Sequence, residues 1–376
     1  MPQEVKTMLK VGILGCGNIS GIYFKNLTTT FSKYVTVYAC ADLDEEKVKA
    51  AAEKYNIPHV MTLDQMLSCP EIDLILNLTT PGGHYPLTKK ALEAGKHVYS
   101  EKPLALEYTQ GKELLELAEK KGLYLGCAPD TFLGAGIQTC ISEIEKGSIG
   151  VPTSATAFMM CHGHESWHPA PEFYYDIGGG PLFDMGPYYI TALVRLLGKA
   201  KSVFAFGSKA IPERTITSQP KNGQKITVKV DTHVAGLISF ENGATASIIM
   251  SFDVWKHRLP NIEIHGTKGS IGVPDPNGFG GKVRLAKEFC QEFELIELIS
   301  PYQENARGIG VAETDLAISE GRLNNASGYF ALHVLEIMDA MTKSAASGEK
   351  ITLESSPAPA IAMDWNVEEG ELKTKS

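Results

Sequence analysis

The chain has 376 residues, of which 43% are hydrophobic and 21% charged, as in an ordinary globular protein of about two domains. The formal net charge is −9, and no basic residues cluster along the chain, so a nucleic-acid partner is not expected. The first residues lack the basic lead and apolar core of a secretory signal, and no apolar run approaches the roughly 20 residues that cross a bilayer. Seven scattered cysteines without a CxxC pair indicate free thiols in a reducing compartment. We expect a cytoplasmic protein without a membrane partner.

The first 130 residues alternate between short apolar runs and amphipathic segments. Strands are predicted over 10–16, 34–42, 73–81, 96–103 and 123–129, with helices over 18–29, 44–55, 85–95 and 111–122. Asp44 is the expected N-cap of the second helix. Strands that alternate with helices of this length indicate βαβ units and a parallel sheet covered on both faces.

After residue 150 the pattern changes to consecutive strand-like runs separated by turns. These runs cover 153–161, 201–208, 225–240, 244–255, 261–266 and 269–274, and a late amphipathic helix is predicted over 331–345. Strands with few helices between them favour an antiparallel sheet. We therefore predict an α/β domain over 1–129 followed by an α+β domain over 130–376.

A glycine motif, "GILGCGNIS", lies where the first strand passes into the first helix. Gly15 permits a tight turn, and Gly17 allows the backbone to approach a pyrophosphate at the helix N-terminus. Asp42 ends the second strand, where a carboxylate can bind both adenosine ribose hydroxyls and would repel a 2′-phosphate. The motif therefore predicts dinucleotide binding and favours NAD over NADP.

A second glycine-rich stretch, "GGGPLFDMGPYYI", covers residues 178–190. Its glycines lead to Asp184, and Tyr188 follows in a helix expected to start near Pro187. The glycines would let this loop pass close to a nicotinamide, while the helix fixes the direction of the two side chains.

Three stretches extend these motifs to a family resemblance. They are "TTPGGHYPLTKKALEAGKHVYSEKP" (79–103), "GGGPLFDMG" (178–186) and "IEIHGTKGSIGV" (262–273). With the opening glycine motif, they resemble the glucose–fructose oxidoreductase/inositol dehydrogenase (Gfo/Idh/MocA) family over essentially the whole chain. The resemblance implies a Rossmann domain and a C-terminal domain with a large, mostly antiparallel open sheet, through which homodimers or homotetramers form. It also implies an NAD(P)-dependent sugar or polyol dehydrogenase of carbohydrate metabolism.

The resemblance also assigns site residues. The family's catalytic lysine falls on Lys102. The segment Asp-x-Gly-x-His-x-x-Asp falls on Asp184, Gly186, Tyr188 and Thr191, so the usual histidine is a tyrosine and the last aspartate a threonine. The cofactor residues expected on this basis and from the glycine motif are Gly15, Gly17, Asn18, Ile19, Asp42, Thr80, His84, Glu101 and Lys102.

The departure at Tyr188 leaves the general base open. A free tyrosine has a pKa of about 10, so Tyr188 needs a nearby ammonium, such as that of Lys102, to act as a base. Asp184 would hold a second hydroxyl or keep the lysine charged. The alternatives are an aromatic wall for Tyr188, a structural ion pair for Lys102 and a helix N-cap for Asp184. His168 is the substitute base.

The segment "CHGHESWHPAPEFYYD" (161–176) supplies the other substrate-binding candidates, namely His162, His164, Trp167 and His168. A flat indole and several imidazoles suit a sugar. A polar surface loop and a divalent-metal site are the alternatives, and no metal is predicted. His84 is placed near the cofactor or as a satisfied histidine at a helix start.

The function predicted from these residues is hydride transfer between NAD and a secondary hydroxyl of a sugar, glycoside or cyclitol. One alternative is an NAD-dependent glycosidase that oxidises its substrate transiently and cleaves it by elimination. The other is a non-enzymatic NAD-binding sensor.

Overall fold

The computed structural model describes residues 8–375, which form two compact units. The first unit contains the chain up to residue 134 together with 299–332 and the segment from 357 onward; the second contains 135–298 and 333–356. The chain thus returns twice to the first unit, whereas the sequence suggested one boundary near residue 130. Residues 1–7, which carry part of the lead used in the signal-sequence prediction, lie outside the described residues.

The first unit is built on a six-stranded parallel sheet with strand order β3-β2-β1-β4-β5-β6. Its strands are β1 (Leu9–Leu14), β2 (Val35–Ala41), β3 (His59–Val60), β4 (Leu74–Asn77), β5 (His97–Ser100) and β6 (Leu125–Cys127). The order reverses between β1 and β4, and ligands of such sheets bind beyond the carboxyl ends of the strands at this point. The predicted cofactor residues follow the ends of β1, β2, β4 and β5.

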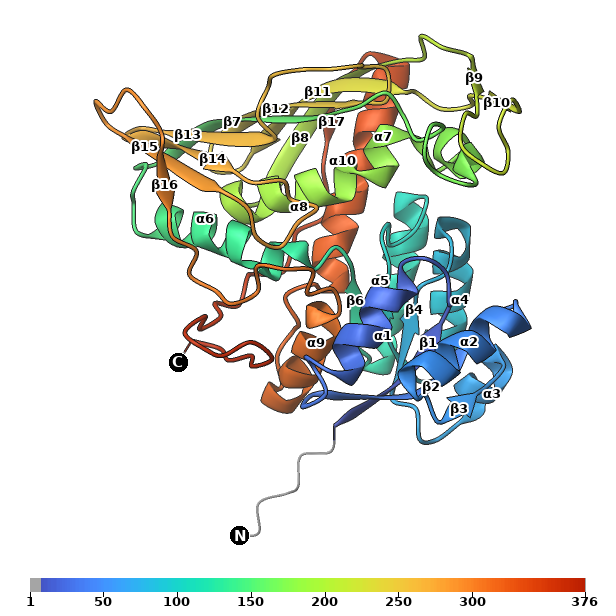
Figure 1. Cartoon of the computed structure of the whole chain (residues 1–376). Helices are drawn as coiled ribbons and strands as arrows, with labels where there is room; N and C mark the ends of the chain where they lie inside the picture. Colours follow the sequence, from blue (N-terminus) through green and yellow to red (C-terminus); the bar gives the residue numbers. More distant parts are fainter. Residues whose placement is uncertain (1–7, 376) are drawn as a thin grey trace. The chain divides into compact units, whose positions relative to one another are not determined.

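Five helices connect these strands and flank the sheet (Figure 1). They are α1 (Ser20–Thr28), α2 (Glu45–Tyr55), α3 (Leu63–Ser68), α4 (Pro81–Glu93) and α5 (Tyr108–Lys121). The prediction for Asp44 is confirmed, because its side chain accepts hydrogen bonds from the backbone N–H groups of Glu46 and Lys47 at the start of α2.

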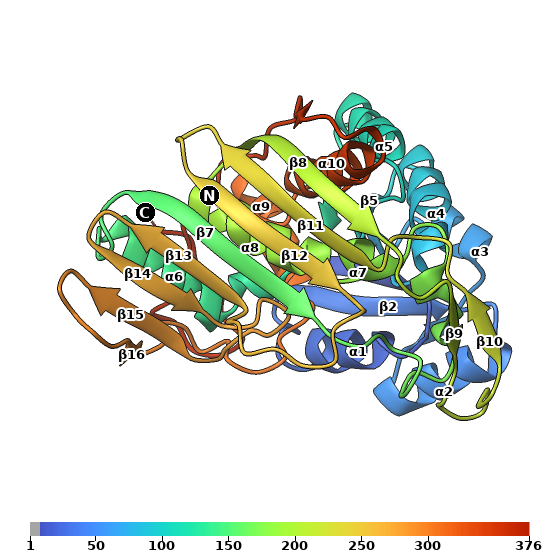
Figure 2. The same cartoon turned by 90° about the horizontal axis from the view of Figure 1, so that it is seen from above.

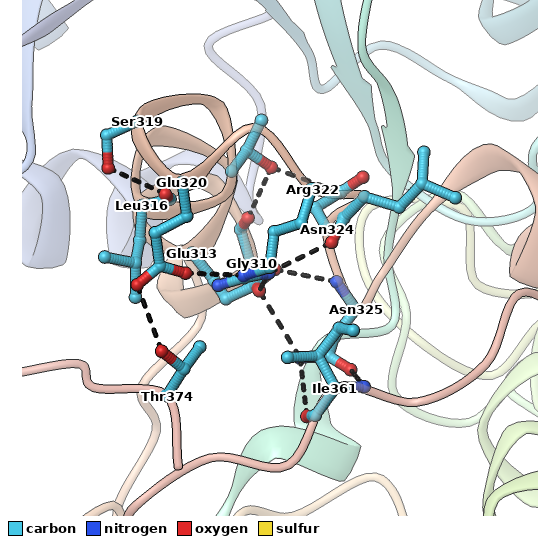
Figure 3. Close-up of polar contacts among 12 residues, drawn as sticks. Gly310, Glu313, Leu316, Ser319, Glu320, Arg322, Asn324, Asn325, Ile361 and Thr374 are labelled. Atoms are coloured by element: carbon cyan, nitrogen blue, oxygen red, sulfur yellow. Dashed lines mark hydrogen bonds and ion pairs between the residues drawn. The ribbon is translucent and has the colours of Figure 1, made fainter. Parts of the chain in front are cut away.

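The segments that return to the first unit are joined to one another by a buried acidic group. Helix α9 (Ile309–Glu320) carries Glu313, which is fully buried and accepts hydrogen bonds from Arg322 Nη1 (2.5 Å) and the backbone N–H of Asn325 (2.8 Å) (Figure 3). The Asn325 side chain in turn accepts the N–H of Ile361 at 2.9 Å. The cluster thus joins α9, the turn after it and the C-terminal segment.

The second unit contains a nine-stranded sheet with order β16-β15-β14-β13-β7-β12-β11-β8-β17 (Figure 2). Neighbouring strands are antiparallel except for the parallel pair β7 and β12, which confirms the predicted mostly antiparallel sheet. The strands are β7 (Pro152–Met160), β8 (Ala200–Ser208), β11 (His233–Phe240), β12 (Thr245–Ser251), β13 (Ile262–Gly266), β14 (Gly269–Val273), β15 (Val283–Lys287), β16 (Glu294–Ile296) and β17 (Ile351–Thr352).

Helices pack on one face of this sheet, and a separate hairpin supplies two short strands. The helices are α6 (Ala135–Glu145), α7 (Gly180–Asp184), α8 (Gly186–Leu197) and the part of α10 (Gly328–Ser347) that lies in this unit; the hairpin strands are β9 (Glu213–Thr215) and β10 (Lys225–Thr227). On the other face, Phe206 and Leu237 of neighbouring strands remain 64% and 55% exposed. None of the helices within residues 8–375 is long and apolar enough to span a bilayer.

Candidate functional site: a nucleotide-binding turn and a histidine–aspartate pair

The glycine turn after β1 requires glycine at its first position. Gly15 has φ +103°, and a Cβ there would come within 2.8 Å of the Leu78 carbonyl group. Its N–H donates to the carbonyl of Ala41 at 2.8 Å, which joins the turn to the end of β2. Gly15 therefore lets the chain turn sharply between two neighbouring strand ends.

Open space and exposed backbone follow this turn. A Cβ on Gly17 would meet nothing within 4 Å, and Gly17, Asn18 and Ile19 are exposed. Helix α1 begins after Ile19 without a side-chain cap and without an acidic residue in its first turn. The Ser20 N–H donates to the Gly17 carbonyl at 3.0 Å, but no side chain caps the helix start, so these exposed residues fit the pyrophosphate of a dinucleotide.

Asp42 braces the glycine turn from the end of β2. Its Oδ2 accepts the backbone N–H of Cys16 at 2.6 Å, and its Oδ1 accepts the N–H of Asp44 at 2.9 Å. Carboxylate oxygens have further lone pairs, so these bonds leave acceptor capacity for ribose hydroxyls.

The turn that carries Lys102 is fixed by two buried neighbours. Glu101, 7% exposed, accepts hydrogen bonds from the Tyr23 hydroxyl (2.8 Å) and the backbone N–H of Lys102 (3.0 Å).

His84, 1% exposed, places Nδ1 2.7 Å from the Pro103 carbonyl oxygen and Nε2 2.9 Å from that of Thr79. Burial lowers the pKa of His84 although both carbonyl oxygens oppose this. His84 thus links the turns after β4 and β5, and Thr80 is the exposed N-cap residue of α4.

In the second unit, Asp184 lies at the end of a short helix. Helix α7 already begins at Gly180, α8 begins at Gly186, and Met185 is the cap residue between them. The expected helix start near Pro187 was one residue late, and the short helix before it was not foreseen. The N-cap of α8 is Met185, so Asp184 does not have that role; Tyr188 lies in the first turn of α8 and is 7% exposed.

The structure pairs Asp184 with a histidine from the loop after β7. His164 Nε2 lies 3.1 Å from Asp184 Oδ2, and the two side chains are 13% and 16% exposed. Trp167 packs edge-on against the His164 ring at 5.1 Å and is itself 59% exposed. On the same loop, His162 stacks on the exposed Trp255, with ring centroids 3.3 Å apart. The loop thus presents imidazoles beside two accessible indoles.

His168 is tied to its own loop. Its Nδ1 accepts the backbone N–H of Ala170 at 3.1 Å, and its carbonyl accepts the hydroxyl of Ser218 at 2.5 Å. Burial lowers the pKa of His168. Within residues 8–375, no three His, Cys, Asp or Glu side chains gather in a way that could hold a metal ion.

A buried arginine cluster supports this loop and was missed in the sequence. Arg214 of β9, 3% exposed, donates to Glu165 Oε1 (2.7 Å), to the carbonyl oxygens of His162 (3.2 Å) and Phe252 (2.9 Å), and to Asp253. Burial would raise the pKa of Glu165, but hydrogen bonds from Tyr175 and Arg214 outweigh it and hold the pKa below its usual range. A single arginine in a short strand 49 residues after Glu165 gives no sequence signal of this contact.

A parallel sheet of this order with a glycine turn after β1 defines the first unit as a Rossmann nucleotide-binding domain. Residues 9–128 match the family model "Oxidoreductase family, NAD-binding Rossmann fold", and residues 137–272 match the "GFO/IDH/MocA C-terminal domain". The chain belongs to the Gfo/Idh/MocA family, as its motifs predicted.

Individual relatives include named sugar dehydrogenases. The chain is 28% identical over 267 residues to D-glucoside 3-dehydrogenase of Escherichia coli, with 69% of this chain and 75% of that protein covered. It is 30% identical over 240 residues to an uncharacterized oxidoreductase of Schizosaccharomyces pombe, covering 59% of this chain and 63%, less than two thirds, of that protein. A solved structure of levoglucosan dehydrogenase in complex with NADH has a TM-score of 0.77 at 25% identity, covering 93% of this chain and 100% of that one.

Proposed function

We propose that the protein is an NAD-dependent oxidoreductase that transfers hydride between nicotinamide and a secondary hydroxyl of a sugar, glycoside or cyclitol. The observation that carries this proposal is the glycine turn closed on Asp42, in a chain whose two halves both match one oxidoreductase family. The relatives that act on glucosides and levoglucosan support the substrate class.

The choice of NAD rests on Asp42. Its carboxylate lies at the end of β2 beside the glycine turn, where a second negative charge would be unfavourable. A ribose with two free hydroxyls offers donors to this carboxylate, whereas a 2′-phosphate offers only negative charge. The lack of a capping acid at the start of α1 is consistent with pyrophosphate at that helix.

Lys102 and Asp184 are the catalytic residues that the family resemblance and the sequence both favour. Bound NAD would accept the hydride that leaves the substrate carbon. Lys102, on the turn held by Glu101 and His84, would donate a hydrogen bond to the reacting oxygen and stabilise its negative charge. Asp184 would hold a second hydroxyl or keep the lysine charged, and the sequence offers Tyr188 and His168 as the proton acceptor of the reacting hydroxyl.

The loop from His162 to His168 is the proposed sugar-binding segment. Its imidazoles can exchange hydrogen bonds with hydroxyl groups, and the exposed face of Trp167 suits the apolar face of a pyranose ring. Phe206 and Leu237 on the open sheet face support a homodimer or homotetramer formed through the second unit.

A panel of sugars, glycosides and cyclitols, incubated with NAD and with NADP, tests the proposal. Net formation of NADH with at least one substrate is expected. Release of a cleaved aglycone without net NADH would instead favour the glycosidase. NAD binding without turnover of any substrate would favour a sensor.

A further inference from the structure

His164 has the local environment of a catalytic histidine. Its Nε2 lies 3.1 Å from Asp184 Oδ2, so in the neutral ring this nitrogen carries the proton and donates it to the carboxylate. Nδ1 then carries the lone pair, and it is buried without a hydrogen-bond partner among residues 8–375. A carboxylate that holds one imidazole nitrogen and leaves the other as a base is the arrangement of histidine–aspartate pairs in hydrolases.

The unpartnered nitrogen indicates a missing donor. The rings of Trp167, Tyr174 and Phe252 contact the imidazole edge-on, with centroids 5.1, 4.2 and 4.7 Å away. A buried polar atom left unpaired is unfavourable, and a hydrogen bond from a bound hydroxyl would remove this penalty. Because Trp167 is itself 59% exposed, a substrate bound on its open face lies beside the imidazole that the indole contacts.

The backbone on both sides of His164 is held by the arginine cluster. Arg214 donates to the carbonyl of His162 and to the side chain of Glu165. The N–H of His164 itself donates to the Tyr175 hydroxyl at 3.2 Å, and that hydroxyl donates to Glu165.

Gly163 shows how tightly the loop is seated on this cluster. It has φ +81°, and an added Cβ would overlap the side chains of Tyr175 and Glu165. A buried ion pair is weak evidence for stability, since desolvation costs about as much as the attraction returns. In this loop, the Arg214–Glu165 ion pair holds the backbone on both sides of His164.

The two other candidates for the base are less suited. The His168 lone pair on Nδ1 already accepts the N–H of Ala170, and burial lowers the pKa of this imidazole. A free tyrosine side chain ionises at about pH 10, so a tyrosine at position 188 forms phenolate near neutrality only if its surroundings favour the charge.

We propose that His164, oriented by Asp184 and by the Arg214–Glu165–Tyr175 cluster, is the general base that replaces the histidine missing at position 188. This rests on the proposed function. In the oxidation, the substrate O–H bond breaks and its proton passes to Nδ1, while its electron pair forms the carbonyl bond. The hydride leaves the same carbon with the electron pair of the C–H bond and would be accepted by the NAD of the proposed function. In the reverse direction the imidazolium returns the proton.

The test uses turnover as a function of pH together with chemical rescue. His164→Ala should lower kcat about 10²–10⁴-fold, the usual contribution of general acid–base catalysis, while NAD affinity stays unchanged. Added imidazole should restore part of the rate with a dependence on the pKa of the imidazole used. His265→Asn, which changes a half-buried histidine of β13 bonded to Ser270, is the matched control and should keep the wild-type rate. Unchanged turnover, or a loss that no imidazole rescues, would overturn the proposal.

A second measurement is independent of turnover and so separates this inference from the proposed function. The charged or titratable groups gathered around the imidazole are Asp184 of α7, Tyr174 and Tyr175 of η2 (Pro171–Tyr175), Arg214 of β9, Asp253 after β12, and Cys161, Glu165 and His168 of its own loop. In ¹⁵N NMR spectra of the neutral imidazole, the wild type should carry the His164 proton on Nε2, and Asp184→Asn should lower the population of this tautomer, because the carboxylate that accepts the proton is lost. An unchanged tautomer would show that the pair does not form, even if the wild type oxidises sugars.

Discussion

Each unit contains an arginine bonded to two carboxylates, Arg322 partly buried in the first and Arg214 buried in the second, but the two clusters join different parts of the molecule. In the first unit, Arg322 bonds Glu313 at 2.5 Å and Glu320 at 2.6 Å, and the C-terminal segment joins through Thr374, whose hydroxyl donates to Glu320 (Figure 3). All its partners belong to the scaffold. In the second unit, Arg214 holds a loop that carries the exposed Trp167 and His164, whose Nδ1 has no hydrogen-bond partner among residues 8–375. The same ion-pair chemistry therefore joins scaffold segments in one unit and holds a loop of the proposed site in the other.

Replacing each arginine tests the difference between the two clusters and has the largest expected effect. Arg214→Met and Arg322→Met should each lower the free energy of unfolding by about 3–5 kcal/mol, because buried carboxylates lose their cation. Urea unfolding measures this loss. Turnover per folded molecule should fall only for Arg214→Met, since Arg322 supports no part of the proposed site. An equal fall in turnover for Arg322→Met would contradict the division of roles.

A second scaffold carboxylate gives the first unit its own pH dependence. Asp130 is 1% exposed and accepts the N–H groups of Gly308 and Gly310 at 2.9 and 3.1 Å. Burial raises its pKa to about 6 from an ordinary 3.8, although the two N–H groups and Arg307 oppose the shift. The folded state therefore binds the proton more tightly than the unfolded state.

The sign of the effect follows from this difference. Stability contributed by protonated Asp130 is complete below about pH 4 and is lost as the pH rises to about 6, by up to ~3 kcal/mol. Asp130→Asn should abolish that part of the slope, since an amide oxygen accepts both N–H groups without titrating. Chemical denaturation of both proteins between pH 4 and 7 measures the difference, and parallel curves would refute the assignment.

A substitution of Asp42 tests whether the first unit alone determines the preference for NAD over NADP. Asp42→Ala should weaken NAD binding by about 10–100-fold, the range expected for lost charge-assisted hydrogen bonds, and weaken NADP binding much less. Isothermal titration with both dinucleotides measures this. Asp44→Ala, which removes only the cap of α2, is the matched control. Equal losses for NAD and NADP would remove the ribose role of Asp42.

How well each region could be predicted from the sequence depends on how far apart its contacting residues lie along the chain. The cap at Asp44 and the glycine turn were predicted because their partners lie in the same short motif or in the next strand. Residues 299–332 were not predicted to join the first unit, since α9 is fixed by side chains such as Glu313 and Asn325 whose pairing is visible only in three dimensions. Asp184 was predicted as a site residue, but its hydrogen-bond partner His164 lies on another loop and gave no sequence signal of the pairing. The sequence therefore offered Tyr188 and His168 as the base, whereas our proposal from the pairing is His164.

Tyr175→Phe is the change with the smallest expected effect, because it removes one oxygen from the cluster and leaves all its charged groups in place. That oxygen accepts the N–H of His164 and donates to Glu165, so its loss should cost about 1 kcal/mol of stability. If orientation of the imidazole matters, kcat should fall about tenfold or more with little change in KM, since small misplacement of a catalytic group is costly. Tyr302→Phe provides the control, because this buried hydroxyl of the first unit donates to the Glu371 carbonyl at 2.6 Å and should affect stability alone. Similar kinetics for the two variants would mean that the second cluster, like the first, only holds the fold together.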